Sequence, residues 1–218
     1  MAKKARCNVS GRAYWRFPAM NREPWAPYSK NPEKFDEEVK EENLPDTFLE
    51  LRERFVDEVG AGSILDAGCG SGRDTDFFAG RGFSAHGIDM ADGMIEYARQ
   101  HRDGSYQKMD LRDLSFQDDL FDGVWASASI FFMPPADMEV TLQEFHRVLK
   151  TSGVLYVNFK EGEGEQVKQI WGDSVTEYHV AADTAEDLLK AAGFTLIDKT
   201  TNVSKSRDNT FFNFLCRK

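Results

Sequence analysis

The sequence of 218 residues has only three cysteines and no long run of apolar residues. The cysteines, Cys7, Cys69 and Cys216, are odd in number and lack the spacing of metal ligands, so neither a disulfide framework nor a zinc site is predicted. A membrane-spanning helix needs roughly 20 consecutive apolar residues, and no such run occurs. The basic opening MAKKARC is followed by polar residues where a signal peptide needs an apolar core. These absences predict a cytoplasmic protein with no metal site and no membrane segment.

Acidic residues outnumber basic ones, and the excess is unevenly distributed along the chain. The net charge is −10, but residues 1–30 hold seven basic residues against Glu23 alone, a net charge of +6, so the other 188 residues carry −16. A body this acidic repels a phosphate backbone, which argues against nucleic acid as its partner. The basic segment 1–27, with Trp15 and Trp25, is interpreted as a disordered or loosely docked arm. Contact of this arm with RNA or an acidic partner is the alternative.

Helical and strand patterns alternate after residue 30. Thr47 with Glu50, and Thr184 with Asp187, have the spacing of capping boxes at helix starts. Gly60 is expected to end the first of these helices. Alternation of this kind predicts an α/β fold with a doubly wound, mostly parallel sheet, and the last two strands are close enough to pair as an antiparallel hairpin. The expected helices cover 47–59, 73–80, 91–101, 135–150 and 184–192, and the expected strands cover 63–65, 83–88, 105–109, 121–126, 154–159, 194–201 and 210–216.

A glycine-rich turn, ILDAGCGSG over residues 64–72, follows the first strand. Gly68, Gly70 and Gly72 would let a ligand approach bare backbone at a helix start, where exposed N–H groups can hold a carboxylate. Glycine turns of this sort serve both dinucleotides and S-adenosylmethionine. The dinucleotide fingerprint needs a third glycine where Arg73 stands, and Asp66 precedes the first glycine by two residues. These departures argue against a nicotinamide cofactor.

Two carboxylates end the next two strands. Asp89 follows Gly68 by 21 residues, and its acceptor-only oxygens suit the two hydroxyls of a ribose. Asp110 ends the third strand and suits an exocyclic amine such as adenine N6. Met90 and Met94 offer soft apolar faces to a ring. The alternative is that the aspartates are turn residues and the methionines belong to the core, but the set together predicts a nucleoside-binding site.

With these residues in view, the sequence resembles the class I S-adenosylmethionine-dependent methyltransferases, in particular their small bacterial and archaeal members. The segments that carry the likeness are ILDAGCGSGRDTDFFAGRGFSAHGID, YQKMDLRDL, FDGVWASASIFFMP and LQEFHRVLKTSGVLYVNFK. The resemblance implies a single methyltransferase domain over residues 28–218. It further implies a three-layer, Rossmann-like arrangement with a seven-stranded sheet whose last strand is antiparallel, and S-adenosylmethionine as the cofactor.

The resemblance also assigns roles within the cofactor site. It implies that the glycine turn holds the methionine part, that Asp89 holds the ribose, and that Asp110 and the backbone of Leu111 meet the adenine. Tyr28 and Phe35 resemble the lead-in helix that folds over the cofactor in these members. Arg73 is expected either near the carboxylate of the cofactor or in a surface salt bridge with Asp74 or Asp76. The expected cofactor-binding residues are Tyr28, Asp66, Gly68, Gly70, Gly72, Arg73, Asp89, Met90, Met94, Asp110, Leu111 and Ser127.

The acceptor region is expected to combine residues 127–135, residues 160–180 and the N-terminal arm. Phe131, Trp171 and His179 are the candidate substrate residues, with a core phenylalanine and a plain strand histidine as the structural alternatives. The segment KEGEGE, residues 160–165, is expected to be a flexible acidic loop, either a lid or a solvated turn. Alignment supplies much of the rate in an in-line methyl transfer, and a base is needed only for a protonated nucleophile, so no catalytic residue is assigned.

The predicted function is methyl transfer from S-adenosylmethionine to a small or medium-sized acceptor, without a metal. Two alternatives stay open at this point. One is an RNA or protein methyltransferase guided by the basic arm, and the other is a non-catalytic S-adenosylmethionine-binding module. The acceptor, the methylated atom and the oligomeric state do not follow from the sequence.

Overall fold

A seven-stranded sheet forms the centre of the molecule in the computed structural model, which describes residues 23–203 and 209–218. The strand order is β3-β2-β1-β4-β5-β9-β8, in which β1 to β5 run parallel and β9 runs antiparallel to both of its neighbours. The predicted doubly wound sheet with an antiparallel end is therefore confirmed. The strands are β1 (Ser63–Ala67), β2 (Ser84–Asp89), β3 (Ser105–Lys108), β4 (Phe121–Ala126), β5 (Leu149–Lys160), β8 (Thr195–Val203) and β9 (Thr210–Arg217).

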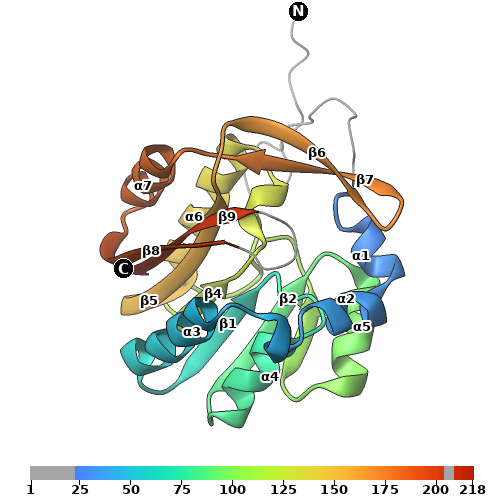
Figure 1. Cartoon of the computed structure of the whole chain (residues 1–218). Coiled ribbons are helices and arrows are strands. Elements are labelled where there is room, and N and C mark those ends of the chain that lie inside the picture. Colours follow the sequence, from blue (N-terminus) through green and yellow to red (C-terminus); the bar gives the residue numbers. More distant parts are fainter. Residues whose placement is uncertain (1–22, 204–208) are drawn as a thin grey trace, which may run out of the picture.

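Helices cover both faces of the sheet because the strand side chains alternate between two apolar cores (Figure 1). Ile64 of β1 packs with the helices on one face, α3 (Asp46–Val59) and α4 (Arg73–Gly80). Leu65, the next residue, packs with those on the other face, α6 (Pro135–Val148) and α7 (Ala182–Ala191). The helix α5 (Asp92–His101) packs on β2 and β3. The result is a three-layer arrangement with the carboxyl ends of the parallel strands along one edge.

The two predicted capping boxes are wrong, although the helices themselves form. The N-cap residues are Pro45 for α3 and Ala181 for α7, and neither makes a side-chain capping hydrogen bond. Thr47 and Thr184 lie inside the first turns, so their hydroxyls are past the capping position. Gly60 does end α3, with a φ of +75°.

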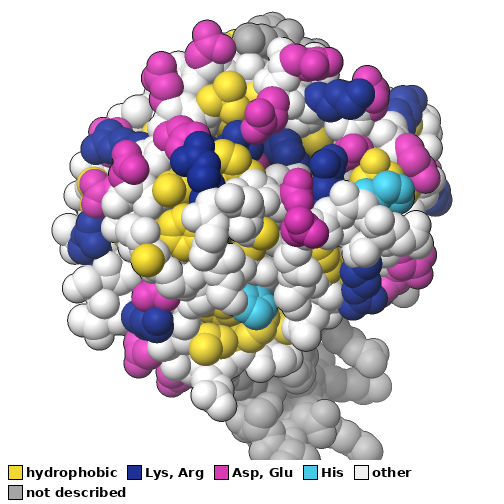
Figure 2. All heavy atoms as spheres, turned by 90° about the horizontal axis from the view of Figure 1, so that it is seen from below, with side chains coloured by type: hydrophobic (Ala, Val, Ile, Leu, Met, Phe, Trp, Pro, Cys, Tyr) yellow, Lys and Arg dark blue, Asp and Glu magenta, His cyan; other side chains and the backbone are white. Residues whose placement is uncertain are grey.

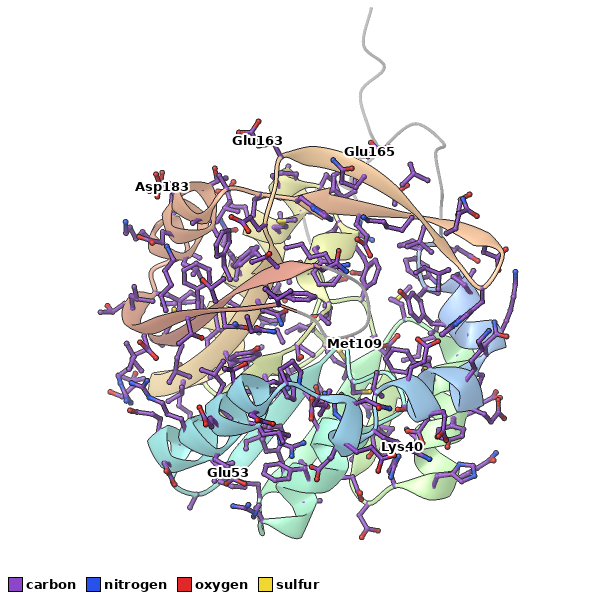
Figure 3. The ribbon with its side chains drawn as sticks, in the orientation of Figure 1. Lys40, Glu53, Met109, Glu163, Glu165 and Asp183 are labelled. Atoms are coloured by element: carbon purple, nitrogen blue, oxygen red, sulfur yellow. The ribbon has the colours of Figure 1, made fainter. Side chains whose placement is uncertain are left out.

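A second sheet, which the sequence analysis did not predict, covers part of the edge where the parallel strands end. It is an antiparallel hairpin of β6 (Gly164–Ile170) and β7 (Asp173–His179), and it crosses the top of the view in Figure 1. The expected flexible acidic loop is therefore wrong in part, since β5 extends to Lys160 and β6 begins at Gly164. Only a short connection remains, and Glu163 points outward from it (Figure 3).

Two short helices, α1 (Ala26–Lys30) and α2 (Pro32–Glu38), lie against the turn of this hairpin (Figure 1). Lys30 Nζ pairs with Asp173 at 3.0 Å, and Trp171 Nε1 donates to Glu38 Oε1 at 2.9 Å. Two short 3₁₀ helices complete the described structure, at Glu41–Asn43 and Ile130–Phe132. Segments that are more than 130 residues apart in the chain thus meet beside the strand ends.

The described residues include no helix that is both long and apolar enough to cross a bilayer. The predicted arm falls largely on residues 1–22, which lie outside the described residues, as does Cys7. Of its described part, residues 26 and 27 belong to α1.

Candidate cofactor and acceptor pocket

A pocket of about 800 Å³ lies at the carboxyl ends of the parallel strands, and α1, α2 and the β6–β7 hairpin contribute to its walls. Most of the predicted site residues come together in it, although they are spread over a hundred positions of the sequence. Those that line it are Tyr28, Asp66, Gly68, Gly70, Arg73, Asp89, Met90, Met94, Asp110, Leu111, Ser127 and Phe131. Three predicted residues do not line the pocket, namely Gly72, Trp171 and His179.

Neighbouring side chains lie close to the backbone of the glycine turn. Gly68 and Gly70 have φ values of +86° and +52°, which side-chain-bearing residues rarely adopt. A Cβ atom on Gly68 would lie 2.3 Å from the Cβ of Ser129. A Cβ atom on Gly70 would lie 2.9 Å from Cε1 of Phe35, the α2 residue of the predicted lead-in pair. The turn therefore needs glycine at both positions.

The N–H groups of this turn are engaged within the chain. Gly68 and Cys69 donate to the carbonyl of Ile88 at 2.8 and 2.9 Å, and Gly70 donates to Asp89 Oδ2 at 3.0 Å. The expectation that these amides are exposed donors for a ligand carboxylate is therefore not met by these three groups. Gly72 serves packing instead, because a Cβ there would lie 2.8 Å from Oη of Tyr106.

A buried ion network lies behind the turn. Arg73 binds Asp74 through Nη2 at 2.5 Å and Nε at 2.9 Å, and Arg52 Nη1 lies 3.1 Å from the same carboxylate. Burial alone would raise the pKa of Asp74, but the charge of Arg73 and then that of Arg52 hold this pKa below its ordinary value. Of the two positions expected for Arg73, the salt bridge with Asp74 is present, and it is buried rather than superficial.

Asp66 has the opposite electrostatic environment. Its carboxylate is 2% exposed and accepts a hydrogen bond of 2.7 Å from Thr75 Oγ1. Burial, with a further contribution from the negative charge of Asp74, raises the pKa of Asp66 to about 8. The pKa values of Asp66 and Asp74 thus shift in opposite directions, because arginines form ion pairs only with Asp74.

The two strand-end carboxylates both line the pocket, and they differ in their partners. Asp89 accepts N–H groups from Ala91 at 2.8 Å and from Gly70 at 3.0 Å, and burial raises its pKa. Asp110 is held by Arg112, whose Nη2 lies 2.7 Å away. Burial would raise the pKa of Asp110, but Arg112 outweighs burial and lowers it. Only Asp89 has its oxygens bound by neutral backbone groups alone.

A buried hydroxyl with no hydrogen-bond partner among the described residues lines the pocket. Ser129 is 8% exposed, and its Oγ has no hydrogen-bond partner among the described residues. The preceding residue is fixed from the end of β5, since Ala128 N donates to Asn158 Oδ1 at 2.8 Å. A buried hydroxyl lacking a partner is costly by about 1–3 kcal/mol, so Ser129 is suited to a polar group of a ligand.

The other half of the pocket has aromatic walls and a buried ion pair that the sequence analysis missed. Lys160 Nζ lies 2.7 Å from Glu177 Oε1, and these side chains are 5% and 2% exposed. The same ammonium lies over the ring of Phe131 at 4.4 Å and that of Phe211 at 5.7 Å from the centroids. The period of two in β7 places Glu177 on the buried face with Val175, which is the signal that could have identified it.

The remaining substrate candidates lie next to this half without lining it. His179 Nε2 is 3.3 Å from Glu177 Oε2, and its Nδ1 is 3.1 Å from the carbonyl oxygen of Glu161. Trp171 lies in the turn of the hairpin, where its ring meets that of Tyr28 edge-on at 5.6 Å between centroids. His179 and Trp171 thus contact residues that line the pocket, Glu177 and Tyr28 respectively.

Comparisons with known proteins agree with this architecture. Residues 64–153 match the methyltransferase domain family. The malonyl-[acyl-carrier protein] O-methyltransferase of Erwinia pyrifoliae is 29% identical over 110 residues, which cover 50% of this chain and 41% of that protein. The chain spans about half the length of the curated relatives it matches.

Solved structures share the fold at low sequence identity. An S-adenosylmethionine-dependent methyltransferase of Methanosarcina mazei superposes with a TM-score of 0.70 at 20% identity, covering 81% of this chain and 98% of that chain. The 1,6-didemethyltoxoflavin-N1-methyltransferase of Burkholderia thailandensis, solved with 1,6-didemethyltoxoflavin and S-adenosylhomocysteine, gives 0.66 at 18% identity over 94% of both chains. The domain match over residues 64–153, the sheet order and these shared folds together support a class I S-adenosylmethionine-dependent methyltransferase.

Proposed function

We propose that this protein transfers a methyl group from S-adenosylmethionine to a small acceptor that enters the same pocket. The observation that carries the proposal is one continuous cavity, with the glycine turn and Asp89 on one side and aromatic walls on the other. Bound S-adenosylmethionine supplies an electrophilic methyl group on a sulfonium. The chain's own contribution is to align the acceptor and exclude water, since alignment can lower such a barrier by about 7–11 kcal/mol.

The pocket residues fit this cofactor in three respects. Gly68 and Gly70 line the pocket with bare backbone, while Ser129 and Phe35 fill the positions that their Cβ atoms would take. Asp89 has acceptor-only oxygens held in place by two backbone N–H groups, which suits two ribose hydroxyls. Ser129 brings a buried hydroxyl without a partner among the described residues. We assign the ribose to Asp89, the adenine to Asp110 and Leu111, and the cover over the cofactor to Tyr28 and Phe35.

A small acceptor suits the walls and the charge better than a nucleic acid. Phe131, Phe132, Met133 and Phe211 make the acceptor half largely apolar. Acidic and basic side chains lie interspersed over the face in Figure 2, with no broad basic area on that face. The neighbour that acts on 1,6-didemethyltoxoflavin supports a small acceptor, and the relative that acts on malonyl-[acyl-carrier protein] acts on a small group carried by a protein. We place the reaction in the cytoplasm and in one domain, residues 28–218.

Calorimetry with S-adenosylmethionine, S-adenosylhomocysteine and NAD tests the cofactor assignment. We expect the first two to bind and NAD not to bind. Asp89→Ala should weaken both by about 10- to 100-fold, because it removes hydrogen bonds to a charged acceptor worth about 1.5–3 kcal/mol. Asp92→Ala is the matched control, since Asp92 is exposed on the adjacent helix and pairs with Lys108.

The outcome for Asp89→Asn separates charge from shape, since the amide retains the size of the side chain. We expect Asp89→Asn to bind S-adenosylmethionine and S-adenosylhomocysteine more weakly than the wild type and more tightly than Asp89→Ala. Tight binding of NAD without binding of the sulfonium compound would falsify the assignment. Binding of the cofactor with no methyl acceptor in a broad screen would favour the non-catalytic alternative.

A further inference from the structure

The side chain of Ser129 lies directly against the glycine turn. A Cβ atom on Gly68 would lie 2.3 Å from the Cβ of Ser129 and 3.1 Å from its Oγ. Ser129 is buried and lines the pocket, and its Oγ has no hydrogen-bond partner among the described residues. Burial of a hydroxyl without a partner is unfavourable, so a ligand that supplies the partner gains affinity from it.

The backbone before Ser129 is held in an unusual conformation. Ala128 has a φ of +53°, a left-handed value that residues with a Cβ atom rarely adopt. Its N–H donates to Asn158 Oδ1 at 2.8 Å, and Asn158 Nδ2 donates to the hydroxyl oxygen of Tyr156 at 3.3 Å. Asn158 and Tyr156 are both buried in β5. Buried strand residues thus hold the strained backbone that places Ser129 in the pocket wall.

The order of the strands gives the position of Ser129 relative to the cofactor. Asp110 follows β3, Asp89 ends β2, the glycine turn follows β1 and Ser129 follows β4, and these strands are neighbours in that order. With the adenine at Asp110 and the ribose at Asp89, the rest of S-adenosylmethionine continues in the same direction past the turn. Its amino-acid end, which has one ammonium and one carboxylate group, therefore comes to the side of Ser129.

Several candidate donors for that carboxylate are already engaged. Three amides of the glycine turn donate to groups of the chain itself. Arg73 donates to Asp74 and to the carbonyl oxygen of Val39. Ser71 is the other pocket residue whose buried hydroxyl has no hydrogen-bond partner among the described residues. It lies on the side of α2, where it helps to lower the pKa of Asp36, which burial alone would raise.

We propose that the hydroxyl of Ser129 donates a hydrogen bond to the carboxylate of S-adenosylmethionine, and so selects for a cofactor with an intact amino-acid end. A carboxylate only accepts hydrogen bonds, and a hydroxyl can donate one. The ammonium of the same end is a donor, and acceptors such as Asp66 line the pocket for it. The proposal rests on the proposed function, because it concerns the cofactor of that reaction. It adds Ser129 to the cofactor site, two residues after the predicted Ser127.

Analogues of S-adenosylhomocysteine test this proposal on the full chain. One lacks the carboxylate and keeps the amine, one lacks the amine and keeps the carboxylate, and 5′-methylthioadenosine lacks both. Calorimetry measures the binding of all of them to the wild type and to Ser129→Ala. We expect Ser129→Ala to bind S-adenosylhomocysteine and the carboxylate-bearing analogue at least about tenfold more weakly, because a hydrogen bond to a charged group is lost. The affinity for the other two compounds should change by less than about twofold.

An equal loss of affinity for the analogue without a carboxylate would overturn the proposal, as would unchanged affinity for S-adenosylhomocysteine. Ser105→Ala is the matched control, since Ser105 is exposed at the start of β3 and does not line the pocket. This variant should bind every compound as the wild type does.

A second pair of variants isolates the hydroxyl if Ser129→Ala does not fold. Threonine and valine have nearly the same shape, and only threonine has a hydroxyl. Ser129→Thr should therefore bind S-adenosylhomocysteine more tightly than Ser129→Val, and the two should bind 5′-methylthioadenosine alike. Equal affinity of the two variants for S-adenosylhomocysteine would contradict the proposal.

The wild type separates this proposal from the proposed function. If S-adenosylhomocysteine does not bind to the wild type, the proposed function itself fails. If it binds to the wild type and to Ser129→Ala with equal affinity, only the assignment of the hydroxyl fails. The two failures are therefore distinguishable within one set of titrations.

Discussion

Asp66 and Asp74 illustrate at the residue scale how position decides the chemistry of identical side chains. Both are buried aspartates that line the pocket, but two arginines contact Asp74 while a threonine hydroxyl contacts Asp66. Their pKa values move in opposite directions as a result. The sequence indicated Asp66 as a site residue by its distance from the glycine turn, but its ionisation depends on partners that only the fold brings near.

The raised pKa of Asp66 predicts a pH dependence of stability. The folded chain holds a proton on Asp66 up to about pH 8, whereas the unfolded chain loses it near its ordinary value of 3.8. The folded state therefore binds more protons between these values, and the free energy of unfolding should fall as the pH rises through this interval. Urea unfolding at pH 5 and pH 8 measures this fall, which should be smaller in Asp66→Asn by at least about 1 kcal/mol.

Asp92→Asn is the control for this experiment, since Asp92 is largely exposed and should leave the wild-type dependence unchanged. Equal pH dependence in the wild type and in Asp66→Asn would show that Asp66 ionises normally in the folded chain.

At the element scale, the hairpin and the helices α1 and α2 form a joint wall of the pocket. Their contacts include the Trp171–Glu38 hydrogen bond, the Lys30–Asp173 ion pair and the edge contact of Trp171 with Tyr28. Tyr28 in turn meets Phe35 edge-on at 5.6 Å between centroids, and both residues line the pocket. Trp171 thus contacts the helices that line the pocket and does not line the pocket itself.

Trp171→Ala should therefore loosen α1 and α2 and weaken cofactor binding indirectly. We expect faster hydrogen exchange of the amides in residues 26–38, and a severalfold loss of affinity for S-adenosylhomocysteine. Val167→Ala is the control, because Val167 is on the same hairpin and is 61% exposed. Unchanged exchange in α1 and α2 would mean that the hairpin does not hold them.

At the scale of the whole molecule, the distribution of charge separates the two enzyme alternatives. Residues 1–22 hold six basic residues and no acidic one, so a chain without them carries a net charge of −16. Such a body should repel RNA at physiological salt, and any affinity of the full chain for RNA should depend on this segment.

Deleting residues 1–22 tests the alternative of an arm-guided enzyme. We expect the shortened chain to bind S-adenosylhomocysteine within about twofold of the full chain and to show no binding to a labelled RNA duplex at about 0.15 M salt. Fluorescence anisotropy measures the RNA binding and calorimetry the cofactor binding. If RNA were methylated by the full chain and not by the shortened one, the small-acceptor assignment would be wrong.

The sheet, the glycine turn and the strand-end carboxylates could be predicted from the amino-acid sequence, because these features depend on local patterns of apolar residues, glycine and strand ends. Asp89 and Asp110 were identified since parallel strands end along the same edge. The sequence did not determine the β6–β7 hairpin, whose strand β6 is almost wholly exposed and lacks an apolar pattern. Only the tertiary structure brought Lys160 to Glu177 and His179, because a contact between distant residues depends on packing that no local pattern contains.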